Sequence, residues 1–165
     1  MRVEKISKKG RLYDGGNECL RYAVEIPRLE GCERINSFYE KIAEECELFC
    51  KEKLFEKLAG KRSESGRYEL SFFVTHNDGE AVSMAFCVSL RCGRENISER
   101  FFAMTWSLSD EQMLPPRILQ RRFGEKKKKI NSKNALFLKN GVLKSLENGE
   151  EINFLLKSMK KSVKT

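Results

Sequence analysis

The sequence contains no apolar run long enough to cross a bilayer, and its first residues are polar and basic where a signal peptide would be apolar. These two absences predict a cytoplasmic protein that makes no membrane contact. The sequence has no internal repeat and no low-complexity tract apart from four consecutive lysines. A chain of 165 residues with 40% hydrophobic and 34% charged residues is therefore expected to form a single globular domain over residues 1–165.

Histidine is almost absent, since His76 is the only one. A Ser-His-Asp or Cys-His centre needs a nucleophile brought close to the imidazole, and the sequence around His76 specifies none. Its neighbours Asn77 and Asp78 are typical of a turn, so we interpret it as a solvated turn histidine. The sequence thus predicts no catalytic residue and a protein that is not an enzyme.

Six cysteines are present, but without a secretory signal they are expected to be reduced thiols that pack as small hydrophobic residues. The pairs Cys46/Cys50 and Cys87/Cys92 lack the two-residue spacing of zinc knuckles. We therefore predict no metal site and no cofactor.

Three segments between Arg67 and Leu108 alternate large apolar residues with small or polar ones, and turn residues such as Asn77-Asp78-Gly79 separate them. This pattern predicts a three-stranded antiparallel meander with one apolar face. The opposite face of its second strand is small and neutral, with Ser83, Ala85 and Cys87. The apolar face requires a cover, and residues Glu33 to Ala59 show the helical period that would supply it. The stripe of this predicted helix consists of Ile35, Phe38, Ile42, Cys46, Phe49, Cys50, Leu54 and Leu58.

The predicted fold class is α+β, a long amphipathic helix packed on an antiparallel sheet, in the order strand, helix, three-strand meander, short helix, hairpin. The core is expected within residues 19–146, preceded by residues 1–17 as an irregular lead-in or a weak edge strand and followed by a frayed basic tail at 153–165. The remaining elements are a strand at Cys19–Pro27, a helix at Arg117–Lys129, and a hairpin of Asn134–Leu138 and Val142–Leu146 joined by Asn140-Gly141.

The positive charge of the chain is concentrated at its end. From Arg117 onward, fourteen lysines and arginines oppose four acids, whereas the first 116 residues carry eighteen against twenty. A basic ridge along the second helix could contact a phosphate backbone, and the alternative is a solubilising surface, since aromatic residues do not interleave with the charges. The ridge consists of Arg117, Arg121, Arg122, Lys126, Lys127, Lys128 and Lys129.

Several short apolar motifs follow one another in an order that resembles a known bacterial domain. They are a strand ending in Tyr22-Ala-Val-Glu-Ile26-Pro27, the segments Leu29-Glu-Gly31 and Ile35-Asn36-Ser-Phe38, the Val82-Ser83-Met84 strand, and the Leu136-Phe-Leu-Lys-Asn-Gly141-Val142 hairpin. Over about Cys19 to Leu146 the chain resembles the domain of largely unknown function shared by lysozyme-sensing anti-sigma factors and some peptidoglycan deacetylases. The turn after its second meander strand departs from that pattern and reads Cys92-Gly93-Arg94-Glu95-Asn96. The resemblance implies a binding module.

Three functions are therefore weighed. The first is a non-catalytic module that binds an unidentified protein partner or ligand, with the face of Ser83, Ala85 and Cys87 as its docking surface. The second is association with nucleic acid through the basic ridge. The third, an enzyme, would need a pocket that converges on His76 with a thiol or carboxylate.

Overall fold

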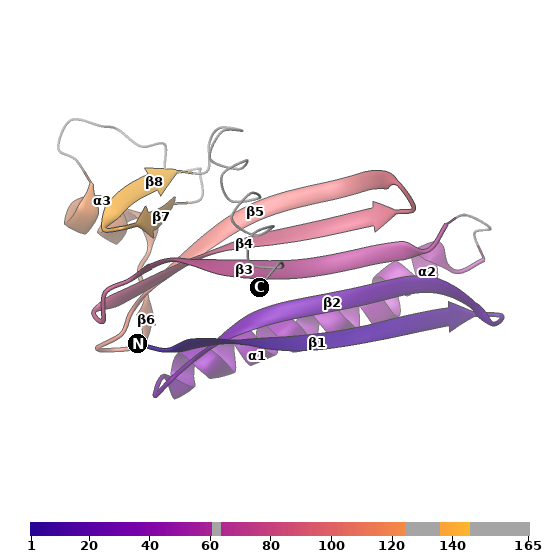
Figure 1. Cartoon of the computed structure of the whole chain (residues 1–165), viewed down its shortest axis with the longest axis horizontal. Helices are drawn as coiled ribbons and strands as arrows, with labels where there is room; N and C mark the ends of the chain where they lie inside the picture. Colours follow the sequence, from indigo (N-terminus) through magenta and orange to yellow (C-terminus); the bar gives the residue numbers. More distant parts are fainter. Residues whose placement is uncertain (61–63, 125–135, 146–165) are drawn as a thin grey trace. The chain divides into compact units, whose positions relative to one another are not determined.

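The computed structural model describes residues 1–60, 64–124 and 136–145. It has an α+β fold with a mixed six-stranded sheet of order β1-β2-β3-β4-β5-β6 and a second sheet of β7 and β8 (Figure 1). The elements are β1 (Val3–Asp14), β2 (Asn17–Leu29), α1 (Glu33–Phe49), the π-helical η1 (Cys50–Leu54), α2 (Phe55–Leu58), β3 (Gly66–Asn77), β4 (Ala81–Cys92), β5 (Glu95–Ser107), β6 (Gln112–Met113), α3 (Pro116–Phe123), β7 (Leu136–Lys139) and β8 (Val142–Ser145).

The described residues form two compact units. Unit 1 comprises Met1–Phe72 and Phe86–Arg100, and unit 2 comprises Phe73–Ala85 and the described residues from Phe101 onward. The strands β3, β4 and β5 each contribute residues to both units.

Unit 1 begins with a hairpin that was only partly predicted. Of the two alternatives for residues 1–17, the structure has the edge strand, and β1 pairs antiparallel with β2 over its full length. The turn at Gly15 and Gly16 has positive φ at both glycines, a conformation that suits residues without a Cβ. The predicted element order is therefore wrong at its start, because two strands precede the helix.

The strand β2 is longer than the predicted Cys19–Pro27 and runs through Pro27 to Leu29. Proline is tolerated there because its nitrogen has no ladder partner. Pro27 lies opposite Lys5, while the parallel pairing of β2 with β3 ends at Val24 and Leu70. The sheet is thus mixed and not wholly antiparallel. A parallel neighbour requires the chain to cross back, and the helical segment between β2 and β3 provides that crossover.

The predicted long amphipathic helix differs from the observed one in two ways. A π-helical segment from Cys50 to Leu54 interrupts it, and the residues it buries include Tyr39 and Ala43, which the predicted stripe omitted. Phe49, which the stripe included, is 44% exposed. The small Ala43 lets the helix approach the sheet closely, and Tyr39 stacks on Phe86 with ring centroids 5.6 Å apart. The buried Tyr39 and Ala43 thus each follow a member of the predicted stripe by one position, whereas Ile35 of the stripe is buried as predicted.

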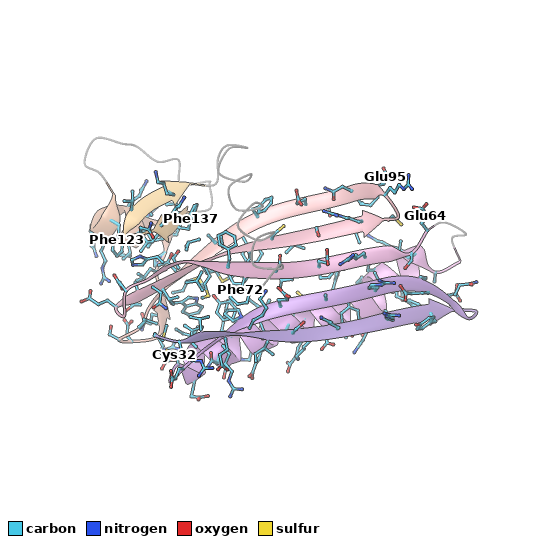
Figure 2. All side chains as sticks on the ribbon, in the orientation of Figure 1. Cys32, Glu64, Phe72, Glu95, Phe123 and Phe137 are labelled. Atoms are coloured by element: carbon cyan, nitrogen blue, oxygen red, sulfur yellow. The ribbon has the colours of Figure 1, made fainter. Side chains whose placement is uncertain are left out.

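Unit 2 is built around the ends of β3, β4 and β5 together with β6, α3 and the β7–β8 hairpin. The hairpin turn falls at Asn140 and Gly141, as predicted, with positive φ at both residues. Pro116 begins α3, and the described helix ends at Phe123, before the predicted end at Lys129. The apolar cluster of this unit consists of Leu114, Leu119, Leu136, Leu138 and Leu143, with Ile118 and Phe123 packed against it. Phe123 is labelled in Figure 2.

Candidate functional site

An open groove in unit 1 lies between the edge strand β1 and the helix α1. It consists of two adjoining cavities of about 310 and 190 Å³, which share Arg28 and Asn36 in their linings. Cys32, labelled in Figure 2, directly precedes α1. The first cavity is lined by Arg2, Glu4, Arg28, Leu29, Glu30, Gly31, Glu33 and Asn36, and the second by Ile6, Lys8, Ile26, Pro27, Arg28, Asn36, Glu40 and Glu44.

One wall of the groove is a strand edge. Among the described residues, no strand pairs with the outer edge of β1. The Glu30 N–H donates to the Arg2 carbonyl at 3.2 Å, so Arg2 and Glu30 form a hydrogen-bonded pair between β1 and β2. In an antiparallel ladder every second residue forms such a pair, and the residues between them direct their main-chain groups outward. It follows that Lys5, Ser7 and Lys9 direct their N–H and C=O groups away from β2. The edge thus offers a row of main-chain donors and acceptors.

The groove is fixed at the point where α1 meets β2, at Asn36, which lines both cavities. Asn36 is buried, and its Oδ1 accepts from the Leu29 N–H at 2.8 Å while its Nδ2 donates to the Leu29 carbonyl at 2.9 Å. The side chain thus pairs with the end of β2 as another strand would. This arrangement satisfies a buried amide and holds the first turn of α1 in place.

A polar contact joins β1 and α1 at Lys8, which lines the smaller cavity. Lys8 Nζ lies 3.6 Å from Glu47, whose other carboxylate oxygen accepts from the Tyr22 hydroxyl at 3.0 Å. Burial, and then the neighbouring Glu47, raises the pKa of Tyr22 to about 12. A Cβ at Gly10 would collide with the Tyr22 ring, so this glycine allows the ring to lie across β1.

The sequence carries features that favour the strand alternative for residues 1–17. Ile6, Lys8, Gly10 and Leu12 alternate with charged and polar residues, and Asp14-Gly15-Gly16-Asn17 is typical of a hairpin turn. Together these features indicate a strand before Cys19. The groove itself could not be predicted, because it depends on where α1 lies relative to β1.

The predicted basic ridge is described only in part. Arg117, Arg121 and Arg122 are exposed on α3, and Lys126, Lys127, Lys128 and Lys129 lie outside the described residues. A hydrogen bond from Ser107 lowers the pKa of Asp110, and Arg122 adds to this effect. Among the described residues, no carboxylate forms an ion pair with Arg117 or Arg121.

The predicted docking face of Ser83, Ala85 and Cys87 is buried at all three residues. In unit 2, the Ser83 hydroxyl accepts from the Leu138 N–H at 3.0 Å and lies 2.8 Å from the Thr105 hydroxyl, so β7 covers this strand. In unit 1, burial raises the pKa of Cys87 to about 11. The face therefore presents no exposed surface at these positions, because its small side chains allow other backbone to approach closely.

His76 is partly buried and its side chain is only 8% exposed, so the prediction of a solvated histidine is wrong. Its Nδ1 accepts from the Gly141 N–H at 3.1 Å, and its Nε2 lies 3.0 Å from Asp78 Oδ2. Backbone N–H groups of Ala81 and Glu80 lower the pKa of Asp78 to about 2. The imidazole thus joins two hairpin turns of unit 2.

The thiols are arranged for packing. Burial raises the pKa of Cys46 and raises that of Cys50 to about 12, and the Tyr68 hydroxyl donates to the Cys46 sulfur. Such thiols remain protonated and unreactive near neutral pH. Within residues 1–60, 64–124 and 136–145, no three His, Cys, Asp or Glu side chains are grouped as a metal would require. No helix in these ranges is both long and apolar enough to span a membrane.

No family model matches the sequence, and no curated protein matches it significantly. A solved structure of a DUF3298 family protein from Pseudomonas aeruginosa PAO1 is similar to the fold, with a TM-score of 0.52 and 11% identity over 71% of this chain and 56% of that one. A DUF3298 family member from Bacteroides fragilis has a TM-score of 0.49 and 14% identity over 77% of this chain and 62% of that one. The chain thus spans little more than half of the length of the Pseudomonas protein. At such low identity the likeness concerns the fold alone, and the fold fits that of a bacterial domain of unknown function.

Proposed function

We propose that this chain is a non-catalytic module that binds an extended segment of a protein partner along β1. One observation carries the proposal: a strand of twelve residues forms the edge of the sheet and directs main-chain groups into the open beside a groove. An extended segment added to such an edge gains main-chain hydrogen bonds, and the neighbouring groove supplies side-chain selectivity.

The charges on β1 are consistent with an edge that avoids indiscriminate pairing. Lysine on an edge strand opposes aggregation, and β1 carries three. Lys5 is paired with Glu25 at 2.8 Å and Lys8 with Glu47 at 3.6 Å. These cations are held by residues of the same chain, so they do not block the outer edge.

A binding role without catalysis is supported by the state of the candidate reactive groups. The buried thiols Cys50 and Cys87 and the partly buried thiol Cys46 have raised pKa values, and both nitrogens of His76 face groups of its own unit. Binding is also what the resemblance to the domain of lysozyme-sensing anti-sigma factors and peptidoglycan deacetylases implies. That resemblance and a cytoplasmic location remain predictions.

The test removes one outward N–H from the edge. Peptides selected from a random display library on the immobilised chain are titrated by fluorescence polarisation against the wild type, Ser7→Pro and Ser7→Ala. Proline removes the donor without a ladder penalty at an edge position, whereas alanine retains the donor. We expect Ser7→Pro to weaken binding by about tenfold or more and Ser7→Ala to leave it unchanged. Selected peptides that all bind Ser7→Pro at wild-type affinity would refute the proposal.

Association with nucleic acid through α3 is the second candidate function, and the exposed Arg117 and Arg121 favour it. They lie one helical turn apart without a described acidic partner, while Leu119 anchors the helix with 2% exposure. Arginines on a rigid helix can contact successive phosphates and release counterions, which makes binding steeply dependent on salt.

The test of this candidate compares labelled single- and double-stranded nucleic acid at low and physiological salt. Wild-type affinity should fall with salt, and Arg117→Glu with Arg121→Glu should abolish binding. A matched variant, Arg94→Glu with Arg100→Glu, makes the same charge change at exposed sites of unit 1 and should retain it. Equal loss in both variants would show that only net charge matters.

A further inference from the structure

The two sides of the groove carry different charges. Three strand cations line the cavities, and two of them are engaged within the chain: Lys8 is held by Glu47, and Arg2 lies 3.0 Å from Glu4. The third, Arg28, forms no ion pair with a described residue. On the opposite side, α1 directs Glu33, Glu40 and Glu44 into the cavities, and all three are exposed. None of them forms an ion pair with a described residue. The helix side of the groove is therefore acidic, and Arg28 is the lining cation that stays outside any ion pair with a described residue.

The smaller cavity combines this acidity with apolar surface. Ile6, Ile26 and Pro27 line it together with Glu40 and Glu44, which lie one helical turn apart on α1. A long aliphatic stem that ends in a cation suits such a lining, because the stem can pack on the apolar residues while the head reaches the carboxylates. Lysine and arginine are the side chains with that construction.

From this lining we infer that the groove selects an extended segment carrying lysine or arginine at alternate positions; the inference rests on the proposed binding along β1. A strand added to β1 points every second side chain toward α1. Those positions meet the acidic side of the groove, and the intervening ones point away from it. The partner is therefore a basic, extended segment of another protein.

Arg28 limits where the partner segment can carry a lysine or arginine. It lines both cavities and lies directly across the ladder from Glu4. A cation of the partner is repelled near Arg28 and attracted near Glu40 and Glu44. The strongest preference for a basic side chain is thus expected beside the middle of α1.

The test uses three synthetic peptides of about nine residues, a common strand length, with lysine, glutamine or glutamate alternating with threonine and valine. Each is titrated by fluorescence polarisation at physiological salt against the wild type, Ser7→Pro, and Glu40→Gln with Glu44→Gln. The control is Glu52→Gln with Glu56→Gln, which changes the net charge equally at exposed residues outside the groove. Urea unfolding of each variant confirms that it is folded.

We expect the lysine peptide to bind the wild type roughly tenfold tighter than the glutamine peptide, the effect of two partly exposed ion pairs. The Glu40→Gln and Glu44→Gln pair should remove this preference, and the Glu52→Gln and Glu56→Gln pair should retain it. Equal affinities for lysine and glutamine peptides, both lost in Ser7→Pro, would overturn the charge inference and leave the edge-strand proposal standing. Binding unaffected by Ser7→Pro, or no binding, would overturn both. Dimerisation of the chain that Ser7→Pro prevents would identify a second copy as the occupant and also overturn the inference.

Discussion

Units 1 and 2 differ in the kind of polar contact that is most frequent in them. In unit 1, several cations on the strands are paired with carboxylates at the surface, as Lys5 is with Glu25 and Arg67 with Glu69. In unit 2, the hydroxyls of Ser83 and Thr105 lie in the interior, with 0% and 1% exposure, while Arg117 and Arg121 on α3 have no described acidic partner.

This difference in polar contacts indicates which interactions stabilise each unit. Exposed ion pairs add little stability, so unit 1 depends on apolar packing around residues such as Tyr39 and Leu20. A buried hydroxyl is costly unless it is bonded, so unit 2 depends on hydrogen bonds as well as on its leucine cluster.

The largest effect is expected from Tyr39→Ala in unit 1. Tyr39 is fully buried and stacks on Phe86, so its truncation should lower the free energy of unfolding by about 3–5 kcal/mol. Leu48→Ala on the same helix is the control. Because Leu48 is 54% exposed, its truncation should change the free energy of unfolding little. Urea denaturation measures both. Similar losses for the two variants would show that α1 does not stabilise unit 1 through its buried face.

The next effect is expected from Ser83→Ala in unit 2. The change leaves the buried Leu138 N–H without its acceptor and should cost about 1–3 kcal/mol. A double-mutant cycle with Thr105→Ala isolates the hydroxyl pair, whose oxygens lie 2.8 Å apart. Strictly additive losses in urea denaturation would contradict coupling between these hydroxyls.

A smaller and pH-dependent effect is expected from Asp78→Ala. The pKa of Asp78 is lowered to about 2 in the folded state, so its carboxylate stabilises unit 2 above its unfolded pKa of about 4. That contribution should disappear as the pH falls from about 4 through 2. The stability difference between wild type and variant, measured in urea at each pH, should narrow over this window. A constant difference would show that the carboxylate charge is unimportant.

The smallest effect is expected from Glu47→Gln in unit 1. Removing the carboxylate charge beside the Tyr22 hydroxyl should lower the pKa of Tyr22, while burial keeps it above that of an exposed tyrosine. The ultraviolet absorbance of ionised tyrosine reports the titration, and Tyr22→Phe assigns it. An unchanged titration would mean that burial alone raises this pKa.

Features set by neighbouring residues could be predicted from the sequence. The turn at Asn140-Gly141 needs two residues that accept positive φ, and an Asn-Gly dipeptide is sufficient to predict it. The alternation from Arg67 to Leu108 likewise indicated three strands that are consecutive neighbours in the sheet.

Features set by distant residues could not be predicted. The burial of Tyr39 and Ala43 on α1 is set by packing against Phe86 and β2, and the helix's own periodicity predicted their neighbours Phe38 and Ile42 instead. The burial of His76 depends on Gly141, which is 65 residues away in sequence. The face of small residues at Ser83 was predicted to be an exposed docking surface, because the sequence cannot show that β7 covers it.

The sequence by itself determined the α+β class, the tight turns and the concentration of positive charge in the last third, because each follows from local pattern or composition. Only the tertiary structure decided that β2 and β3 are parallel, that β1 is a sheet edge, and that an acidic helix side lies beside it. The physical reason is that a groove is formed by elements that meet in space, and the periodicity of one segment carries no information about its neighbours.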